Sequence, residues 1–195
     1  MQGELVDGRR ARRDRNMEAV VDAALELIAE GNPRPGVAEI AERSGVSARS
    51  LFRYFDDLTE LHALALERQS EVVADLYEPI DASGSRGRRI ERFVEHRLHQ
   101  YDVMGPYARA ALARAATSDV IREGLRSRRS ALRRQMEAVF EPELSKLAPS
   151  ARRDVVDALE VATTFEAIET LRVERRRSRA SAGRVLTLTV DRLLR

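Results

Sequence analysis

Apolar residues recur at intervals of three and four along most of the chain, and this spacing constrains the fold more than any other feature. After an arginine-rich start, the first such series is Met17, Val20, Val21, Ala24, Leu27 and Ile28. This pattern gathers the apolar side chains on one face of an α-helix. Long alternating runs of β-branched residues are absent, and proline and glycine are scarce. The sequence therefore predicts an all-α fold of about nine helices.

Composition places the chain among globular proteins. Of its 195 residues, 43% are hydrophobic and 34% are charged, which is enough to build a buried core. Cysteine is absent, so disulfides and thiolate metal sites are excluded and a reducing cytoplasm is the expected location. No apolar run approaches the roughly 20 residues of a membrane-spanning helix, and the N-terminus lacks the apolar core of a signal peptide.

Glycine and proline mark the expected ends of the helices. Gly31, Pro33 and Pro35 stop the first helix, and Gly105–Pro106 should interrupt the chain near its middle. Pro142 and Pro149 bracket a loop. The helices expected between these points cover about residues 37–44, 48–55, 58–76, 90–104, 107–116, 120–140, 150–175 and 178–194.

Two of these helices are short and are separated by very few residues. The stretch "AEIAERSGVSARSLFRYF", residues 38–55, joins them at Gly45, which can adopt a left-handed turn. Val46 supplies an apolar plug, and Ser47 is a good N-cap for the second helix. This arrangement is typical of a helix-turn-helix, whose second helix presents its N-terminal residues to the major groove of DNA.

The second short helix carries side chains suited to DNA. Its predicted exposed positions are Ser47, Ala48, Arg49, Ser50, Arg53 and Tyr54. Arginine can bind guanine through two hydrogen bonds, and hydroxyl groups suit phosphate. The net charge of this region neither supports nor excludes DNA binding, because residues 1–60 carry nine arginines and twelve carboxylates. The pattern alone leaves open a structural helix pair whose arginines are only solvated.

The same region resembles the N-terminal domain of tetracycline-repressor (TetR) family regulators. The resemblance lies in "AALELIAEG" (23–31), "IAERSGVSARSLFRYF" (40–55) and the closing Leu61. It implies a DNA-binding domain over residues 1–60, and an effector-binding and dimerisation domain over residues 61–195. The chain departs from the family where a capping Thr or Ser is replaced by Gly36, where a small residue is replaced by Arg49, and where a lysine is replaced by Leu58. We expect Arg49, Arg53 and the N-terminal arginines to replace the missing phosphate contacts.

The C-terminal helices predict a subunit interface. "VLTLTV", residues 185–190, is apolar around much of its circumference, more than a surface helix should be. Core packing explains one face, and the remainder suggests contact with a second subunit. The resemblance implies a homodimer held by four helices, two from each chain.

The middle helices are expected to enclose a small, largely apolar effector. They supply aromatic residues, adaptable methionines and one arginine on an otherwise apolar stripe. The predicted ligand-binding residues are Phe93, Arg97, Tyr101, Met104, Tyr107, Met136, Phe140 and Phe165. A plain hydrophobic core explains the same residues without a ligand.

Other chemistry has little support in the sequence. His96 and His99 are spaced for one helix face, but no third or fourth metal ligand accompanies them. No phosphate-binding glycine loop and no nucleophile motif is present, so we expect no enzyme activity and no cofactor. The sequence predicts a dimeric, ligand-responsive repressor that binds a palindromic double-stranded operator. The alternative is a helical oligomerisation protein that binds no specific DNA.

Overall fold

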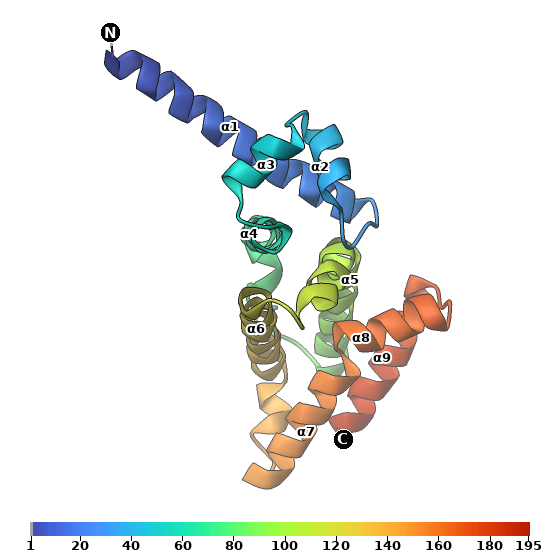
Figure 1. The fold of residues 1–195 in the computed structure, drawn as a ribbon. Coiled ribbons are helices and arrows are strands. Elements are labelled where there is room, and N and C mark those ends of the chain that lie inside the picture. Colours follow the sequence, from blue (N-terminus) through green and yellow to red (C-terminus); the bar gives the residue numbers. More distant parts are fainter. Residues whose placement is uncertain (1) are drawn as a thin grey trace. The chain divides into compact units, whose positions relative to one another are not determined.

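The chain folds into helices joined by short loops (Figure 1). The computed structural model describes the backbone of residues 2–195 and the side chains of residues 10–195. Within this part the structure has nine α-helices and no strand, which confirms the predicted all-α fold. The α-helices are α1 (Gln2–Ala29), α2 (Val37–Ser44), α3 (Ala48–Tyr54), α4 (Leu58–Val72), α5 (Arg86–Arg114), α6 (Asp119–Leu144), α7 (Pro149–Ala162), α8 (Phe165–Glu169) and α9 (Arg179–Leu193).

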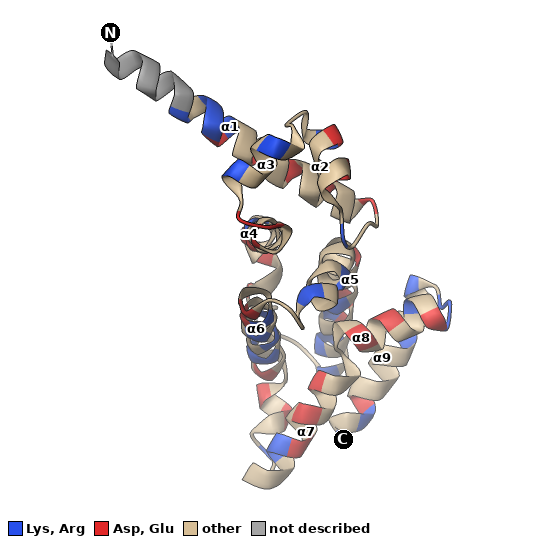
Figure 2. Cartoon of the chain, in the orientation of Figure 1, with Lys and Arg blue, Asp and Glu red and all other residues tan. Residues whose placement is uncertain are grey.

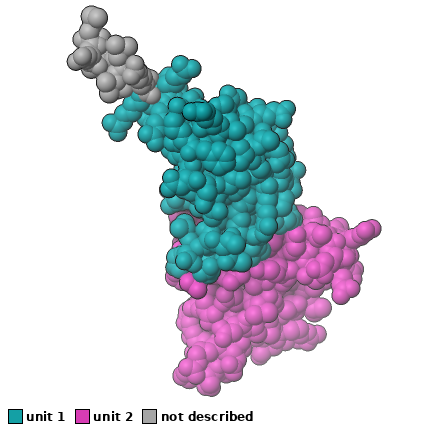
Figure 3. Space-filling view, viewed as in Figure 1, with its two compact units in different colours: residues 1–73, 106–125 teal, residues 74–105, 126–195 magenta. Residues whose placement is uncertain are grey.

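Two shorter helical segments complete the chain. A 3-10 helix, η1 (Ala74–Tyr77), follows α4, and a π-helix, η2 (Thr170–Glu174), follows α8. The residues form two compact units, which Figure 3 shows in teal and magenta. Unit 1 comprises residues 1–73 and 106–125, and unit 2 comprises residues 74–105 and 126–195. These units describe contacts in the folded chain, and the domain boundary after residue 60 stays a prediction.

Unit 1 is built around one face of α1. The buried cluster joins α1 to α2, α3 and α4 through Val20, Val21, Ala24, Ile40, Leu51, Phe55, Leu61 and Ala65. Val20, Val21 and Ala24 belong to the apolar series that predicted the first helix. Two-turn helices have little stability alone, so this shared core holds α2 and α3 in place.

α5 is longer than the sequence predicts. Gly105–Pro106 was expected to end a helix, but α5 runs without interruption from Arg86 to Arg114. Proline within a helix removes one backbone hydrogen bond, here to the carbonyl of Asp102, whose side chain is exposed. Buried residues both before and after Pro106, such as Tyr101 and Ala110, keep the two halves helical. Gly105 is the last residue of α5 in unit 2, and Pro106 is the first in unit 1.

The penultimate helix is shorter than predicted. Instead of one helix over residues 150–175, α7 ends at Ala162 and α8 begins at Phe165. Two threonines cause the break, because the Thr163 hydroxyl donates to the Leu159 carbonyl at 2.8 Å and the Thr164 hydroxyl accepts from the Ala167 N–H at 3.1 Å. Local side-chain bonds of this kind compete with the helix backbone.

Unit 2 has its own core, drawn from α5, α6, α7, α8 and α9. Its buried members include Phe93, Phe140, Leu159, Ile168, Leu186 and Val190. The rings of Phe93 and Phe140 meet edge to face with centroids 5.0 Å apart. Leu186 and Val190 lie within this core, where they are 2% and 0% exposed. These two side chains are therefore covered within the chain itself and are not available to a subunit interface.

A buried arginine ties the end of α5 to the other helices of unit 1. The Arg114 Nε donates to Nδ1 of His62 on α4 at 2.9 Å, and its Nη1 donates to the carbonyl of Pro33. In return, Arg34 donates to the carbonyl of Ala113. These bonds join the α1–α2 loop, α4 and α5, and they require a neutral His62 whose Nδ1 can accept a hydrogen bond.

The acid sensitivity of unit 1 should follow from this contact. Burial, and then the charge of Arg114, lower the pKa of His62 to about 4. The unfolded chain takes up a proton near pH 6.5, whereas the folded chain resists it until about pH 4, so His62 lowers stability as the pH falls through this window.

We expect the free energy of unfolding to fall by about 2 kcal/mol more between pH 7 and pH 5 in the native chain than in His62→Gln. The glutamine carbonyl can accept from Arg114 but does not titrate. Urea unfolding of both proteins at each pH measures the difference. Equal pH dependence would show that His62 does not titrate differently on folding.

Candidate DNA-binding surface

The turn between α2 and α3 has the geometry that the sequence predicts. Gly45 adopts φ 67° and ψ 10°, a left-handed conformation that costs glycine little. Val46 is buried, and Ser47 caps α3 by accepting the Ser50 N–H at 3.3 Å. The chain therefore turns sharply and starts α3 within two residues of Gly45.

α3 buries one face and exposes the other. Leu51 and Phe55 lie in the core of unit 1. Ser47, Ala48, Arg49 and Arg53 are exposed, and Ser50 is half-buried. Five of the six predicted DNA-binding residues thus reach the surface of one short helix and its cap.

Tyr54 differs from the prediction, because its side chain is only 9% exposed. Its hydroxyl oxygen accepts from Asn16 Nδ2 at 3.0 Å and from Arg53 Nη2 at 3.1 Å. These two bonds lower the pKa of the phenol. The ring packs in the core of unit 1 at the end of α3. In a helix of seven residues, the spacing of apolar residues distinguishes the buried face from the exposed face poorly. The hydroxyl proton of Tyr54 stays available to an acceptor such as a phosphate oxygen.

Phe52 is an exposed residue of α3 that the sequence interpretation missed. Its side chain is 55% exposed, between Arg49 and Arg53 along the same helix. Because Leu51 and Phe55 occupy the core four residues apart, the position after Leu51 turns outward. An exposed phenyl ring can contact the methyl group of thymine in the major groove.

Arginines of α1 add positive charge near α3. Arg10, Arg12, Arg13 and Arg15 are exposed, whereas the side chain of Arg9 lies outside the described residues. Figure 2 shows basic residues on α3 and on the neighbouring part of α1. Arg13 acts on the Tyr54 hydroxyl through its charge. Exposed arginines of this kind suit phosphate groups.

The departures at Gly36 and Leu58 have structural consequences. Gly36 lacks a capping side chain, and its N–H donates to Glu39 Oε2 at 2.8 Å instead. Asn32 also donates to Glu39, at 2.9 Å, so the first turn of α2 is stabilised without a hydroxyl. Leu58 is half-buried and packs against the core of unit 1.

The predicted effector residues divide between the two units. Phe93, Tyr101, Met136 and Phe140 are buried in the core of unit 2, and Phe165 packs against them. The Tyr101 and Phe165 rings stack with centroids 5.3 Å apart. Arg97 and Met104 of α5 are also buried, but Tyr107 packs in unit 1, beside Ala110 and Ile121. Five of the eight predicted residues therefore share one core of unit 2, and Tyr107 belongs to a core of unit 1.

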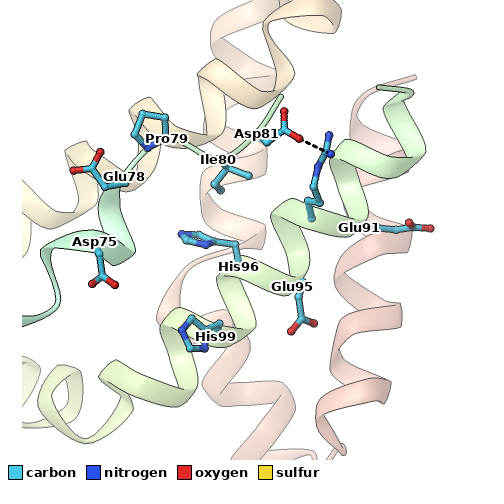
Figure 4. A pocket seen from close by; sticks show the side chains of 10 residues that line it. Asp75, Glu78, Pro79, Ile80, Asp81, Glu91, Glu95, His96 and His99 are labelled. Atoms are coloured by element: carbon cyan, nitrogen blue, oxygen red, sulfur yellow. Dashed lines mark hydrogen bonds and ion pairs between the residues drawn. The ribbon is translucent and has the colours of Figure 1, made fainter. Parts of the chain in front are cut away.

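A surface hollow of about 610 Å³ lies beside η1 and α5 in unit 2 (Figure 4). It is lined by Asp75, Glu78, Pro79, Ile80, Asp81, Glu91, Arg92, Glu95, His96 and His99. His96 is half-buried, and its Nε2 lies 2.9 Å from the Leu76 carbonyl oxygen, whereas His99 is exposed. Among the described residues, no group of three or more histidines and carboxylates is placed to hold a metal ion. The described helices also include none that is long and apolar enough to cross a membrane.

A sharp turn, a capped short helix and exposed basic side chains together define a helix-turn-helix DNA-binding protein. Residues 20–63 match the family of bacterial regulatory proteins called the tetR family. The whole fold is similar to a tetR-family transcriptional regulator from Streptomyces coelicolor, with a TM-score of 0.69 and 22% identity over 92% of this chain and 79% of that one. It is also similar to a transcriptional regulator from Rhodococcus sp. Rha1, with a TM-score of 0.66 and 21% identity over 93% of this chain and 95% of that one.

Residues 20–63 thus match the tetR family of bacterial regulatory proteins, and the helices of the whole chain share the fold of the two solved regulators. The resemblance predicted from residues 23–31 and 40–55 is confirmed. At these levels of identity, the two solved structures establish the fold of the remaining helices and nothing about their ligands.

Arg49 provides the sharpest test of the DNA-binding surface. We expect Arg49→Ala to lower affinity for a selected binding site by about 1–3 kcal/mol while affecting random DNA less, because a base contact carries specificity. Fluorescence anisotropy titrations on both DNAs measure this difference. Arg43→Ala is the matched control, since Arg43 of α2 pairs with Glu30 at 2.8 Å and Glu26 at 3.2 Å. Equal losses on both DNAs would instead assign Arg49 to a phosphate.

Proposed function

We propose that the chain is a ligand-responsive repressor that binds a palindromic operator as a homodimer. The observation that carries this proposal is the surface of α3, where Arg49, Phe52 and Arg53 are exposed above a buried face. A helix fixed in this way can enter the major groove with its first turn toward the bases. Ser47, Ser50 and the Tyr54 hydroxyl would then contact the DNA backbone.

The C-terminal helices support a homodimer. α7 packs against α9, and each helix also exposes a large apolar side chain. Val161 at the end of α7 is 70% exposed, and Leu188 of α9 is 59% exposed. Leu188 lies on the side of α9 away from Ala182, Leu186 and Val190, which are buried in the core. Two apolar faces on packed neighbouring helices suit burial against a second copy.

We expect Val161→Glu combined with Leu188→Glu to convert the dimer to a folded monomer. Four glutamates would face one another across a two-fold interface, and burying them would cost more than the apolar contacts provide. Light scattering after size exclusion measures the mass, and circular dichroism checks the fold. Leu147→Glu is the control, because Leu147 is 38% exposed in the α6–α7 loop. A dimer that survives both glutamates would place the interface elsewhere.

Unit 2 is the proposed effector domain. Its interior combines Phe93, Tyr101 and Phe140 with the flexible Met136, a mixture that can repack around an apolar molecule. The last turns of α5 and the first turns of α6 belong to unit 1, where Ala110, Ala111 and Ile121 pack with Ile28 and Leu66. Both helices continue into unit 2, so a ligand that shifts them also acts on the helices that carry α3. A tenfold loss of operator affinity needs about 1.4 kcal/mol of preference for the non-binding arrangement.

Selection of DNA from a random pool tests the proposed function. A sequence-specific dimer should recover an inverted repeat whose half-sites lie about one helical turn, roughly 10 base pairs, or a multiple of it apart. A helical oligomerisation protein would recover no shared sequence and would bind only in a salt-sensitive way. Recovery of a single unrepeated site would retain DNA binding but contradict the symmetric dimer.

A further inference from the structure

Unit 2 buries an arginine that has no acidic partner. The described chain has three buried arginines, Arg89, Arg97 and Arg114. Arg89 pairs with Glu143, and Arg114 donates from Nε to His62 Nδ1 and from Nη1 to the carbonyls of Pro33 and Ala110. Arg97 is only 4% exposed, and among the described residues it forms no ion pair.

The neighbours of Arg97 are neutral. Its Nη1 donates to Gln100 Oε1 at 2.9 Å, and its Nη2 donates to the carbonyl of Leu132 at 2.6 Å. The guanidinium carbon lies 4.8 Å from the centre of the Phe93 ring. Its Nε is buried and has no hydrogen-bond acceptor. One donor of a buried cation is therefore unsatisfied.

The acidic groups nearest to Arg97, Tyr77 and Glu160, do not neutralise the charge of its guanidinium. Tyr77 acts on Arg97 through space, but burial raises the pKa of its phenol above 10, so the group is uncharged at neutral pH. Glu160 also acts only at a distance, because its carboxylate pairs with Arg133. Burial lowers the pKa of Arg97 to about 10, which still leaves the guanidinium protonated at pH 7.

An unpaired buried cation is costly, and proteins commonly pair it. In the structure the carbonyl oxygen of Leu132 occupies one of the positions that a carboxylate oxygen would take. Gln100, the acceptor at Nη1, is held by bonds from its Nε2 to the carbonyl of Leu76 and to Gln135 Oε1, the latter at 3.2 Å. Arg97 thus has neutral acceptors at Nη1 and Nη2 and an open donor at Nε, on the edge that Nε shares with Nη2.

We propose that the effector of unit 2 carries a carboxylate, which binds the Arg97 guanidinium at Nε and Nη2 and replaces the carbonyl oxygen of Leu132 at Nη2. The remainder of the effector is apolar, because Arg97 borders the core that contains Phe93, Met136 and Phe140. Arginine binds carboxylate through two parallel hydrogen bonds, which gives orientation as well as affinity. This inference rests on the proposed effector function and specifies its ligand class as amphipathic organic acids.

The surface hollow of Figure 4 is a different place and does not suit this ligand. Five carboxylates line it, from Asp75, Glu78, Asp81, Glu91 and Glu95. They would repel an organic acid, and neither Arg97 nor Gln100 lines the hollow.

Binding at Arg97 also has a route to the DNA-binding helices. Gln100 and Gln135 both donate to the carbonyl of Leu76 in η1, and Gln135 donates as well to the carbonyl of Glu78. η1 directly follows α4 in the chain. Arg97 donates to Gln100, so a carboxylate that moves the guanidinium also acts on one of the two side chains that hold the segment after α4.

The test uses matched compounds with the full-length protein. The probes are straight-chain carboxylates of 8 to 16 carbons and 4-alkylbenzoates, each beside its uncharged primary amide, with inorganic phosphate as a bare anion. Thermal shift and calorimetry measure binding. We expect at least one carboxylate to bind the native protein about tenfold or more tightly than its amide, a difference of about 1.4 kcal/mol. Phosphate should not bind, because it lacks the apolar part.

Two variants assign the preference to Arg97. Arg97→Met, which keeps the length and removes the charge, should bind carboxylate and amide equally. Arg88→Met, on the exposed side of the same helix, should retain the native preference. If Arg97→Met does not fold, the ¹⁵Nε signal of Arg97 in the native protein replaces it, and this signal should move with the carboxylate and not with the amide.

The outcomes separate this inference from the proposed function. Equal binding of acids and amides, binding of acids by Arg97→Met as tightly as by the native protein, or no binding by any carboxylate would overturn the inference. Release of operator DNA by an amide as well as by an acid would support the effector function and refute the carboxylate. Binding of acids through Arg97 without release of DNA would support the carboxylate site and refute ligand-responsive repression.

Discussion

The packing of α3 onto α1 and α2 is the interaction on which DNA recognition depends. α3 has only seven residues, and a helix of this length is not stable alone in water. Leu51, with 0% exposure, and Phe55, with 2%, anchor it in the core of unit 1. The left-handed Gly45 and the Ser47 cap set where it begins. Because Leu51 and Phe55 are buried, the exposed face of α3 has a fixed orientation. In that orientation Arg49, Phe52 and Arg53 can enter the same major groove.

The three buried arginines of the described chain all lie on α5, Arg89 and Arg97 in unit 2 and Arg114 in unit 1. Arg114 joins α5 to the α1–α2 loop and to α4 through bonds that need a neutral His62. Arg97 lies in unit 2 on the same helix, where its only side-chain hydrogen-bond partner is an amide. Polar groups in an apolar interior have a small number of satisfactory arrangements, so they favour discrete states over gradual deformation. α5 carries buried arginines in both units, which makes it the structural link between effector and DNA in our account.

The sequence was most informative where one helix face is strictly apolar. The spacing of Val20, Ala24, Ile40 and Leu51 predicted α1 to α3 and their shared core, and the turn at Gly45 followed from the conformation that only glycine adopts freely. Tyr54 and Phe52 were misplaced because a seven-residue helix completes only about two turns. Near its ends, neighbouring elements rather than periodicity decide which side chain is covered.

Other errors arose from contacts that a sequence does not display. Gly105–Pro106 appeared to end a helix, yet buried residues on both sides keep α5 continuous. The break at Thr163 and Thr164 depends on two hydroxyl bonds that compete with the backbone. Leu186 and Val190 were assigned to the subunit interface, whereas tertiary packing places them inside unit 2 and leaves Leu188 outside. The sequence also could not predict that Arg97 has no carboxylate partner. That depends on which carboxylates pair with other arginines in the folded chain, as Glu160 pairs with Arg133.

The most direct test of the central claim, that α3 enters the major groove in each half of a symmetric site, is methylation interference on the selected operator. Methylation of guanine N7 adds a group to the floor of the major groove, where α3 is expected to lie. Our account predicts that methylated guanines block binding at symmetric positions in the two half-sites, on one side of the duplex. Binding that tolerates every N7 methyl group but fails when the minor groove is blocked would contradict it.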